Sequence, residues 1–214
     1  KADASKKTVT LEEVVVTAQR REENLQEVPL AISAIGADEL EMRGIRNVFD
    51  LSAAVPNLYA GASAGTTGIS VYGIRGASSS QPSVYVDPPV GMYLDGVYLG
   101  KSQGSVLDVV DIERIEVLRG PQGTLFGRNT EGGAINFVTR QPSGEFSGRF
   151  EVSGGEYNHK IGRLHVDLPR WGVLSASLTA RKEKMDGWAE NLTGPDDLGA
   201  LDKDACRAVH KSDL

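Results

Sequence analysis

The 214-residue chain has one cysteine and three dispersed histidines. A single cysteine excludes an internal disulfide, and no Cys/His spacing matches a zinc site. Basic residues are outnumbered, 23 against 29 acidic ones, and the net charge of −6 argues against general nucleic-acid binding. No Ser, His and Asp order indicates a catalytic triad. We therefore expect no enzyme, no metal centre, no cofactor and no nucleic-acid partner.

Long apolar runs are missing as well. No stretch approaches the ~18 apolar residues that a transmembrane helix requires. The first residues, KADASKKTVT, lack the apolar core of a signal peptide. Glycine is in excess: 25 of the 214 residues are glycine, whereas the usual share of about 7% would give about 15. The glycines fall mostly at turns and inside β-like stretches, which indicates a β-rich chain with many loops.

Residues 28–140 have the mixed pattern of a globular domain. Glycine-, serine- and proline-rich stretches at 60–68 and 77–89 predict long loops, and such loops on a compact scaffold tend to carry binding. The candidate ligand-contacting residues in them are Ala60, Gly61, Ser63, Gly65, Ser78, Ser79, Gln81 and Tyr85. We expect strands at 28–35, 69–75, 92–98 (with a hairpin turn at Asp95), 112–118 and 134–139, and short helices at 37–43, after Asn47, at 105–109 and within 118–127.

After residue 142 the pattern alternates strictly. Strands are predicted at 147–155, 160–168 and 173–181, each with one apolar and one polar face. A soluble sheet with one buried face would have this pattern, and so would outer-membrane barrel strands with lipid-facing apolar residues. Three strands cannot close a barrel, which needs about eight, so the second interpretation requires a longer protein.

A short strand is predicted near the start, in TLEEVVVTA at 10–18. Three β-branched valines favour an extended backbone, and the charged residues 19–27 indicate a solvated tether. A strand on a tether suits addition to the edge of another protein's sheet. The alternatives are a disordered tail and a strand that pairs within its own domain.

Five segments occur in one order: EEVVVTA, VPLAISAI, IRG, MYLDGVYLG and IERIEVLRGPQGTLFGRNTEGGAINFVTRQP. In this order they resemble the N-terminal plug domain of TonB-dependent outer-membrane receptors, over essentially the whole chain. The resemblance implies an α+β plug domain at 28–142, a small mixed sheet with short helices. It implies a flexible segment with the TonB box at 1–27. At 143–214 it implies the first three antiparallel strands of a truncated transmembrane β-barrel and the start of an extracellular loop that contains Cys206.

The same resemblance implies a receptor fragment that takes up a scarce nutrient, most often a ferric siderophore. The expected location is the outer membrane of a Gram-negative bacterium, with the plug and N-terminus towards the periplasm. The expected partners are the periplasmic domain of TonB, a small-molecule ligand of the metal-chelate type, and the membrane. The segment that corresponds to the TonB box is Glu12, Glu13, Val14, Val15, Val16, Thr17 and Ala18.

Two arginines, Arg75 and Arg119, follow predicted strands. Considered without the other motifs, both are ordinary solvent-exposed turn residues. By resemblance they pair with acidic groups of the barrel, since a guanidinium stays charged and makes two-pronged contacts with carboxylates. A soluble α/β ligand-binding module without a membrane role remains the alternative for the whole chain, and an enzyme that binds an anionic substrate at its glycine-rich segments is a weaker one.

Overall fold

The chain divides into two units, Lys1–Thr139 and Arg140–Leu214. The structure is a computed structural model that describes residues 15–17, 21, 23–45, 48–62, 70–78, 87–100, 111–192 and 198–212. Within these ranges, none of the helices has the length and apolar character needed to cross a membrane.

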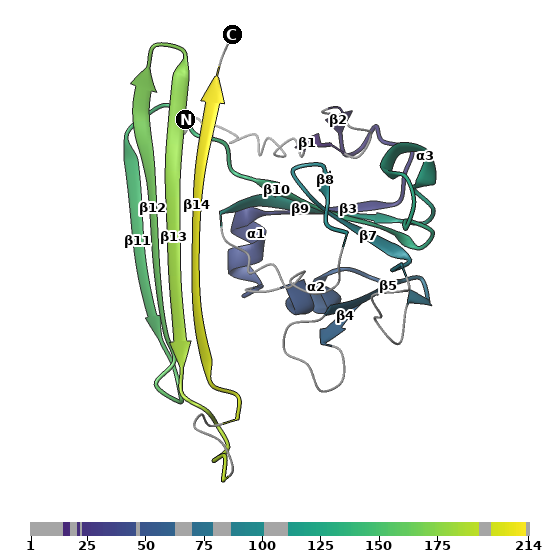
Figure 1. Cartoon of the computed structure of the whole chain (residues 1–214). Coiled ribbons are helices and arrows are strands. Elements are labelled where there is room, and N and C mark those ends of the chain that lie inside the picture. The colour runs from purple at the N-terminus through teal and green to yellow at the C-terminus, as the bar shows by residue number, and fades with distance from the viewer. Residues whose placement is uncertain are drawn as a thin grey trace, which may run out of the picture. The chain divides into compact units, whose positions relative to one another are not determined.

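The first unit is built on a five-stranded mixed sheet (Figure 1). Its neighbouring strands are antiparallel except for β10 (Gly133–Thr139) and β7 (Val90–Leu94), which are parallel. The strands expected here are confirmed, with one adjustment: β3 starts after Pro29, which cannot donate a ladder hydrogen bond. The hairpin turn that the Asp-Gly pair at Asp95 predicts within 92–98 is also confirmed. The spatial order is β3 (Ile32–Gly36), β9 (Ile112–Arg119), β10 (Gly133–Thr139), β7 (Val90–Leu94) and β8 (Val97–Tyr98).

Short helices and a small antiparallel sheet surround this mixed sheet. Helix α1 (Ala37–Met42) has Asp38 and Glu39 in its first turn, where the helix dipole favours acids. Gly44 follows the end of this helix with a φ of 67°. The helix expected at 105–109 and the cap Asn47 lie outside the described residues. The remaining elements are α1 (Ala37–Met42), η1 (Val48–Asp50), α2 (Leu51–Ala54), β4 (Leu58–Ala62), β5 (Ser70–Ile74), β6 (Ala77–Ser78) and α3 (Gly123–Phe126).

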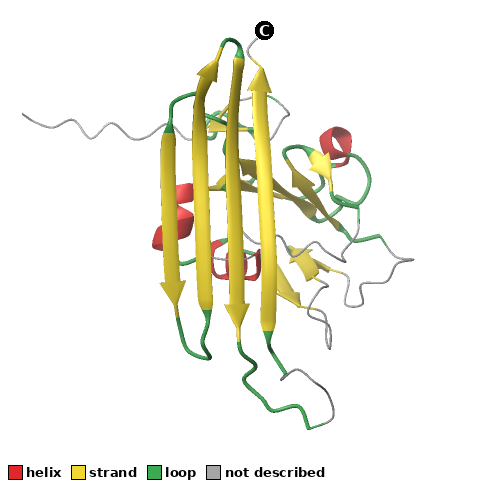
Figure 2. Cartoon of the chain, turned by 60° about the vertical axis from the view of Figure 1, so that its left-hand side comes forward, coloured by secondary structure: helices red, strands yellow, loops and turns green. Residues whose placement is uncertain are grey.

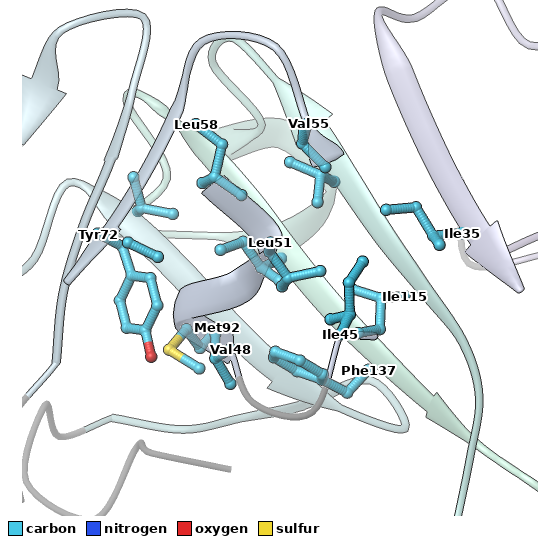
Figure 3. Packing of buried hydrophobic residues seen from close by; sticks show 14 of the residues in the cluster. Ile35, Ile45, Val48, Leu51, Val55, Leu58, Tyr72, Met92, Ile115 and Phe137 are labelled. Atoms are coloured by element: carbon cyan, nitrogen blue, oxygen red, sulfur yellow. The ribbon is translucent and has the colours of Figure 1, made fainter. Parts of the chain in front are cut away.

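Strand β9 alternates its side chains between two apolar clusters, one on each face of the sheet. Ile115 and Val117 belong to the larger cluster, where the sheet packs against η1 and α2. Leu118 belongs to the smaller cluster on the opposite face. Figure 3 shows part of the larger cluster, with Ile35, Val48, Leu51, Met92, Ile115 and Phe137 among its labelled members.

The smaller cluster is covered by the N-terminal segment and α3. Strands β1 (Val15–Val16) and β2 (Glu23–Asn24) lie on this side of the sheet, whereas α1, α2, β4 and β5 lie on the other (Figure 1). Tyr93 supports this side from β7: its ring centroid lies 4.9 Å from that of Phe126, and its hydroxyl donates a 2.7 Å hydrogen bond to the Phe126 carbonyl. Tyr93 and Phe126 are thus held together by the packing of their rings and by a hydrogen bond that satisfies the buried Tyr93 hydroxyl.

The second unit is a four-stranded antiparallel sheet in sequence order (Figure 2). The three strands that the alternation predicts are confirmed. A fourth strand follows where the start of an extracellular loop was expected, and that expectation is wrong for residues 201–212. The strands are β11 (Ser147–Gly154), β12 (Lys160–Trp171), β13 (Leu174–Met185) and β14 (Leu201–Ser212).

Strand β14 pairs with β13 along its full length, from Leu201 opposite Met185 to Ser212 opposite Leu174. Its sequence, LDKDACRAVHKS, has charges on both faces, so no apolar alternation marks it as a strand. Pairing depends instead on main-chain hydrogen bonds, which are available to any non-proline sequence. Cys206 therefore lies in the middle of a strand, exposed and opposite Ala180, and not in a loop.

Candidate functional site

The N-terminal strand is paired within its own unit. Val15 lies opposite Asn24 and Val16 opposite Glu23, in antiparallel register. These residues therefore have a partner strand in their own chain, which agrees with the alternative of pairing within the domain. Addition of the segment to another protein's sheet stays a prediction. The other TonB-box candidates, residues 12–14 and 18, lie outside the described residues.

Burial of Val16 explains why this pairing is stable. Val16 is fully buried, whereas the neighbouring Val15 is 38% exposed. Removing a valine side chain from water contributes roughly 1.5–3 kcal/mol. The side chains that form the smaller cluster with Val16 are Val28, Tyr93, Leu118, Phe126 and Ala134.

The segment expected to be a solvated tether is also partly structured. Glu23 and Asn24 form β2. The turn that follows is closed by the Glu27 amide, which donates to the Asn24 carbonyl at 2.9 Å, and by the Gln26 amide, which donates to Asn24 Oδ1 at 2.9 Å. An asparagine that bonds the backbone two residues on stabilises such a turn.

Thr17 is held by a buried carboxylate. Its amide donates to Glu116 Oε1 at 2.8 Å, and its hydroxyl lies 3.0 Å from Oε2. Glu116 is fully buried in β9, an interior strand of the sheet. Asn136, directly opposite on β10, donates through Nδ2 to Glu116 Oε2 at 3.2 Å and to the Thr17 hydroxyl at 3.3 Å. A residue of the TonB-box candidate is thus bonded to the middle of the sheet.

Arg114 supplies the compensating charge for this carboxylate. Its Nε donates to Glu116 Oε1 at 2.8 Å, and its Nη1 pairs with Glu113 at 2.7 Å. A buried charge is tolerated when it is paired and its remaining lone pairs are satisfied. Thr17, Arg114, Glu116 and Asn136 meet this condition, and we refer to these four residues as the Glu116 cluster.

The Glu116 cluster was not anticipated from the sequence. One signal could have identified it: in IERIEVLR, a glutamate stands between Ile115 and Val117 in a strand with apolar residues on both faces. Charged residues are almost never fully buried without a partner. A search for the partner would have led to the polar positions of the neighbouring strand and of the N-terminal segment.

The predicted ligand-contacting residues are only partly described. Ala60 and Gly61 lie in β4 and Ser78 in β6, so the irregular loops do not begin at 60 and 77 as expected. Ala60 is buried, and both its backbone groups bond the Ser52 hydroxyl, at 2.7 Å from the amide and 3.1 Å from the carbonyl. Ser63, Gly65, Ser79, Gln81 and Tyr85 lie outside the described residues.

The structure brings Arg75 close to the segment that contains Arg119. Arg75 is exposed in the turn after β5, with a φ of 54°. Its guanidinium lies so close to Gly120 that a Cβ added there would be 3.1 Å from Arg75 Nη1. Arg119 is half-buried, and no side chain or backbone group in the described ranges accepts a hydrogen bond from its Nε. The Arg75 guanidinium therefore lies beside the residue that follows Arg119 in the chain.

Polarity in the four-stranded sheet is reversed relative to a soluble sheet. Apolar side chains of one face are exposed, including Phe150 at 71% and Leu178 at 47%. On the other face Thr179, Arg181 and Glu183 are buried. Arg181 Nη2 donates to Glu183 at 2.7 Å. The exposed apolar side chains on these strands and their ends include Phe146, Phe150, Val152, Leu164, Leu168, Trp171, Leu174 and Leu178.

The described ranges contain no group of three or more His, Cys, Asp or Glu side chains that could hold a metal ion. The histidines have other contacts: His159 Nε2 lies 2.7 Å from Glu183 Oε1, and His165 Nδ1 lies 2.8 Å from the Thr179 hydroxyl. Both contacts belong to the polar face of the four-stranded sheet.

Comparison with known proteins gives one family. The family model of the TonB-dependent receptor plug domain matches residues 24–134. The chain is 32% identical over 189 residues to a pesticin receptor from Yersinia pestis, which covers 87% of this chain and 28% of that protein. It is 37% identical over 158 residues to an iron-regulated outer membrane virulence protein from Vibrio cholerae, covering 71% of this chain and 24% of that protein.

The fold agrees with a solved structure. The ferric yersiniabactin uptake receptor FyuA from Yersinia pestis superposes with a TM-score of 0.76 at 31% identity, over 85% of this chain and 28% of that one. The chain thus spans about a quarter of the length of these relatives. From the match to the plug-domain model over more than half of its residues, the chain belongs to the family of TonB-dependent receptors and contains their plug domain.

Proposed function

We propose that this chain is the N-terminal part of an outer-membrane receptor that takes up a scarce nutrient by a TonB-dependent route, most simply a ferric siderophore. The observation that carries the proposal is the reversed polarity of β11–β14 directly after a plug domain. Strands of 8–12 residues with an apolar exposed face match the length and the lipid-facing side of barrel strands. A soluble module would bury that face.

The proposed location is the outer membrane, with the plug and N-terminus towards the periplasm. Membrane fractionation of the full-length gene product tests this against the soluble alternative. We expect the protein in the outer-membrane fraction, and we expect a tag at its N-terminus to be digested by protease only after the periplasm is opened. Recovery in the soluble fraction would support the soluble binding module instead.

The proposed partner of the N-terminal segment is the periplasmic domain of TonB, which would capture residues 12–18 as an added strand. Strand addition gains affinity from main-chain hydrogen bonds and specificity from alternate side chains. Ligand would bind on the β4 and β5 side of the sheet, opposite β1, with the candidate residues at 60–65 and 78–85. Binding must favour one state of the N-terminal segment over the other, because a ligand shifts an equilibrium only through differential affinity.

The proposed ligand class rests on what the relatives are named for. Their names refer to iron regulation and to ferric yersiniabactin. The test is growth of a deletion strain under iron limitation, complemented with the full-length gene and supplied with a panel of ferric siderophores. We expect restored growth with at least one of them. Growth on cobalamin, haem or an oligosaccharide alone would keep the receptor and replace the ligand class.

Arg75 and Arg119 are proposed to anchor the plug through acidic barrel residues. Two observations support the proposal: the Arg75 guanidinium lies beside Gly120, the residue after Arg119, and Arg119 Nε has no acceptor within the described ranges. A guanidinium can bind a carboxylate through two parallel hydrogen bonds. Arg75→Glu or Arg119→Glu in the full-length receptor should loosen the plug and lower uptake. Arg43→Glu serves as the matched control, because Arg43 lies on the surface and is already paired with Glu39. Unchanged plug retention and uptake in both variants would overturn this assignment.

A further inference from the structure

The N-terminal segment is held on the plug by two separate contacts. Val16 is fully buried in the smaller apolar cluster. Thr17, the next residue, is bonded through both its amide and its hydroxyl to Glu116, and Asn136 donates to the same hydroxyl. One residue supplies apolar burial and the other supplies charge-assisted hydrogen bonds, which are the stronger kind.

These contacts are incompatible with capture by another sheet. A segment that adds to a partner's edge must offer its main-chain donors and alternate side chains to that partner. The Thr17 amide is already donated to Glu116 at 2.8 Å. The Val16 side chain is out of reach of any second protein while it is buried. The segment can therefore be bonded to the plug or to a partner, but not to both through these groups.

We propose that the Glu116 cluster is a holding site that competes with TonB for the N-terminal segment and sets how tightly the ligand-free receptor binds TonB. The proposal rests on the proposed function, because it takes the competing partner to be TonB. It assigns positioning roles to Arg114 and Asn136, which orient the carboxylate, and the holding role to Glu116.

The position of Glu116 supports a role beyond folding. Replacing a buried charged group by an apolar residue of similar volume is often neutral or stabilising, so a carboxylate in the interior strand β9 is not explained by stability alone. Its two oxygens bond Thr17, Arg114 and Asn136, and Thr17 is the only one of these that lies outside the mixed sheet, 99 residues away in sequence. What this buried charge adds is the attachment of the N-terminal segment to the mixed sheet.

The test is the affinity of the ligand-free, full-length receptor for the purified periplasmic domain of TonB. Thr17→Val removes the hydroxyl and keeps a β-branched side chain. The same substitution in a synthetic peptide of residues 10–18 measures its direct effect on TonB binding. The change in TonB affinity of the receptor is divided by the change in TonB affinity of the peptide. After this correction, we expect the Thr17→Val receptor to bind TonB about tenfold more tightly than wild type, the factor that corresponds to one hydrogen bond to a charged group.

Two further variants complete the experiment. Glu116→Gln removes the charge at nearly constant volume and should tighten TonB binding in the same direction, without touching the TonB-binding segment. Thr139→Val is the matched control, because Thr139 makes the same arrangement with Asp95: its amide donates to Oδ1 at 2.8 Å and its hydroxyl to Oδ2 at 2.7 Å. It should leave TonB affinity unchanged.

The outcomes distinguish a failure of the holding site from a failure of the proposed function. If the peptide binds TonB but neither Thr17→Val nor Glu116→Gln tightens binding to the receptor, the holding site is overturned and the proposed function stands. An equal gain in the Thr139→Val control would also overturn it, since general loosening of the plug would then explain the effect. If neither peptide nor receptor binds TonB, the proposed function is overturned and the holding site with it.

Discussion

The two units of this chain use the same two-residue alternation with opposite results. In the plug, β9 and β10 bury apolar side chains, including Ile115 and Phe137 at 0% exposure. In the four-stranded sheet the apolar side chains are exposed, and Thr179, Arg181 and Glu183 are buried. Periodicity tells which residues share a face, but the surrounding medium decides which face is stable outside. The difference indicates that the two units are built for different surroundings.

The largest effect is expected from a cavity in the plug. Phe137→Ala should destabilise the first unit by about 3–5 kcal/mol, because a fully buried ring is removed from a packed cluster. Hydrogen exchange of the β9 and β10 amides in the full-length receptor measures it. The matched variant is Phe150→Ala, whose ring is 71% exposed and which should leave these amides protected. Equal exchange in both variants would break the distinction between the units.

A charge on the exposed apolar face should have the next largest effect. Leu178→Arg places a guanidinium in the middle of β13, which costs roughly 2–4 kcal/mol if that face meets lipid near the bilayer centre. The fraction of full-length receptor assembled in the outer membrane should fall. Ser212→Arg lies on the same face at the strand end and should cost about 0–1 kcal/mol.

Water around the same face would give a different result. An exposed leucine in a soluble sheet usually tolerates substitution within about 0.5 kcal/mol. Normal assembly of the Leu178→Arg receptor would therefore contradict the lipid-facing interpretation.

The smallest perturbation uses the single cysteine as a probe. Cys206 is exposed on β14 opposite Ala180, on the apolar face. In intact outer membranes an apolar maleimide should label it, and a charged, membrane-impermeant maleimide should label it far more slowly. Denatured receptor should react with both reagents. Equal labelling by both reagents in the membrane would place this face in water.

Much of the plug followed from the sequence, because each local signal agreed with the final packing. Apolar runs bounded by glycine predicted β9 and β10, and the Asp-Gly pair predicted the turn at Asp95. Strand β14 did not follow, since its charges on both faces hide the alternation and only pairing with β13 reveals it. The Glu116 cluster joins residues 99 positions apart, and no local pattern reports such a contact.

The N-terminal strand shows the same limit at a candidate site. Its valines predicted an extended backbone, and Val15–Val16 is a strand. The place where this strand packs depends on the fit of Val16 against residues of β7, β9 and β10, which are distant in sequence. Intrinsic preference fixed the local conformation, and tertiary packing fixed the partner.

The most direct test of the account is capture of the full-length receptor by the periplasmic domain of TonB, compared between wild type and Val15→Pro. Proline removes a backbone donor that an added strand needs. It also weakens the pairing of Val15 with Asn24, so a loss of capture cannot come from tighter attachment to the plug. The account predicts that capture and ferric-siderophore uptake are both lost while the receptor still reaches the outer membrane. Unimpaired capture and uptake by the Val15→Pro receptor would contradict it.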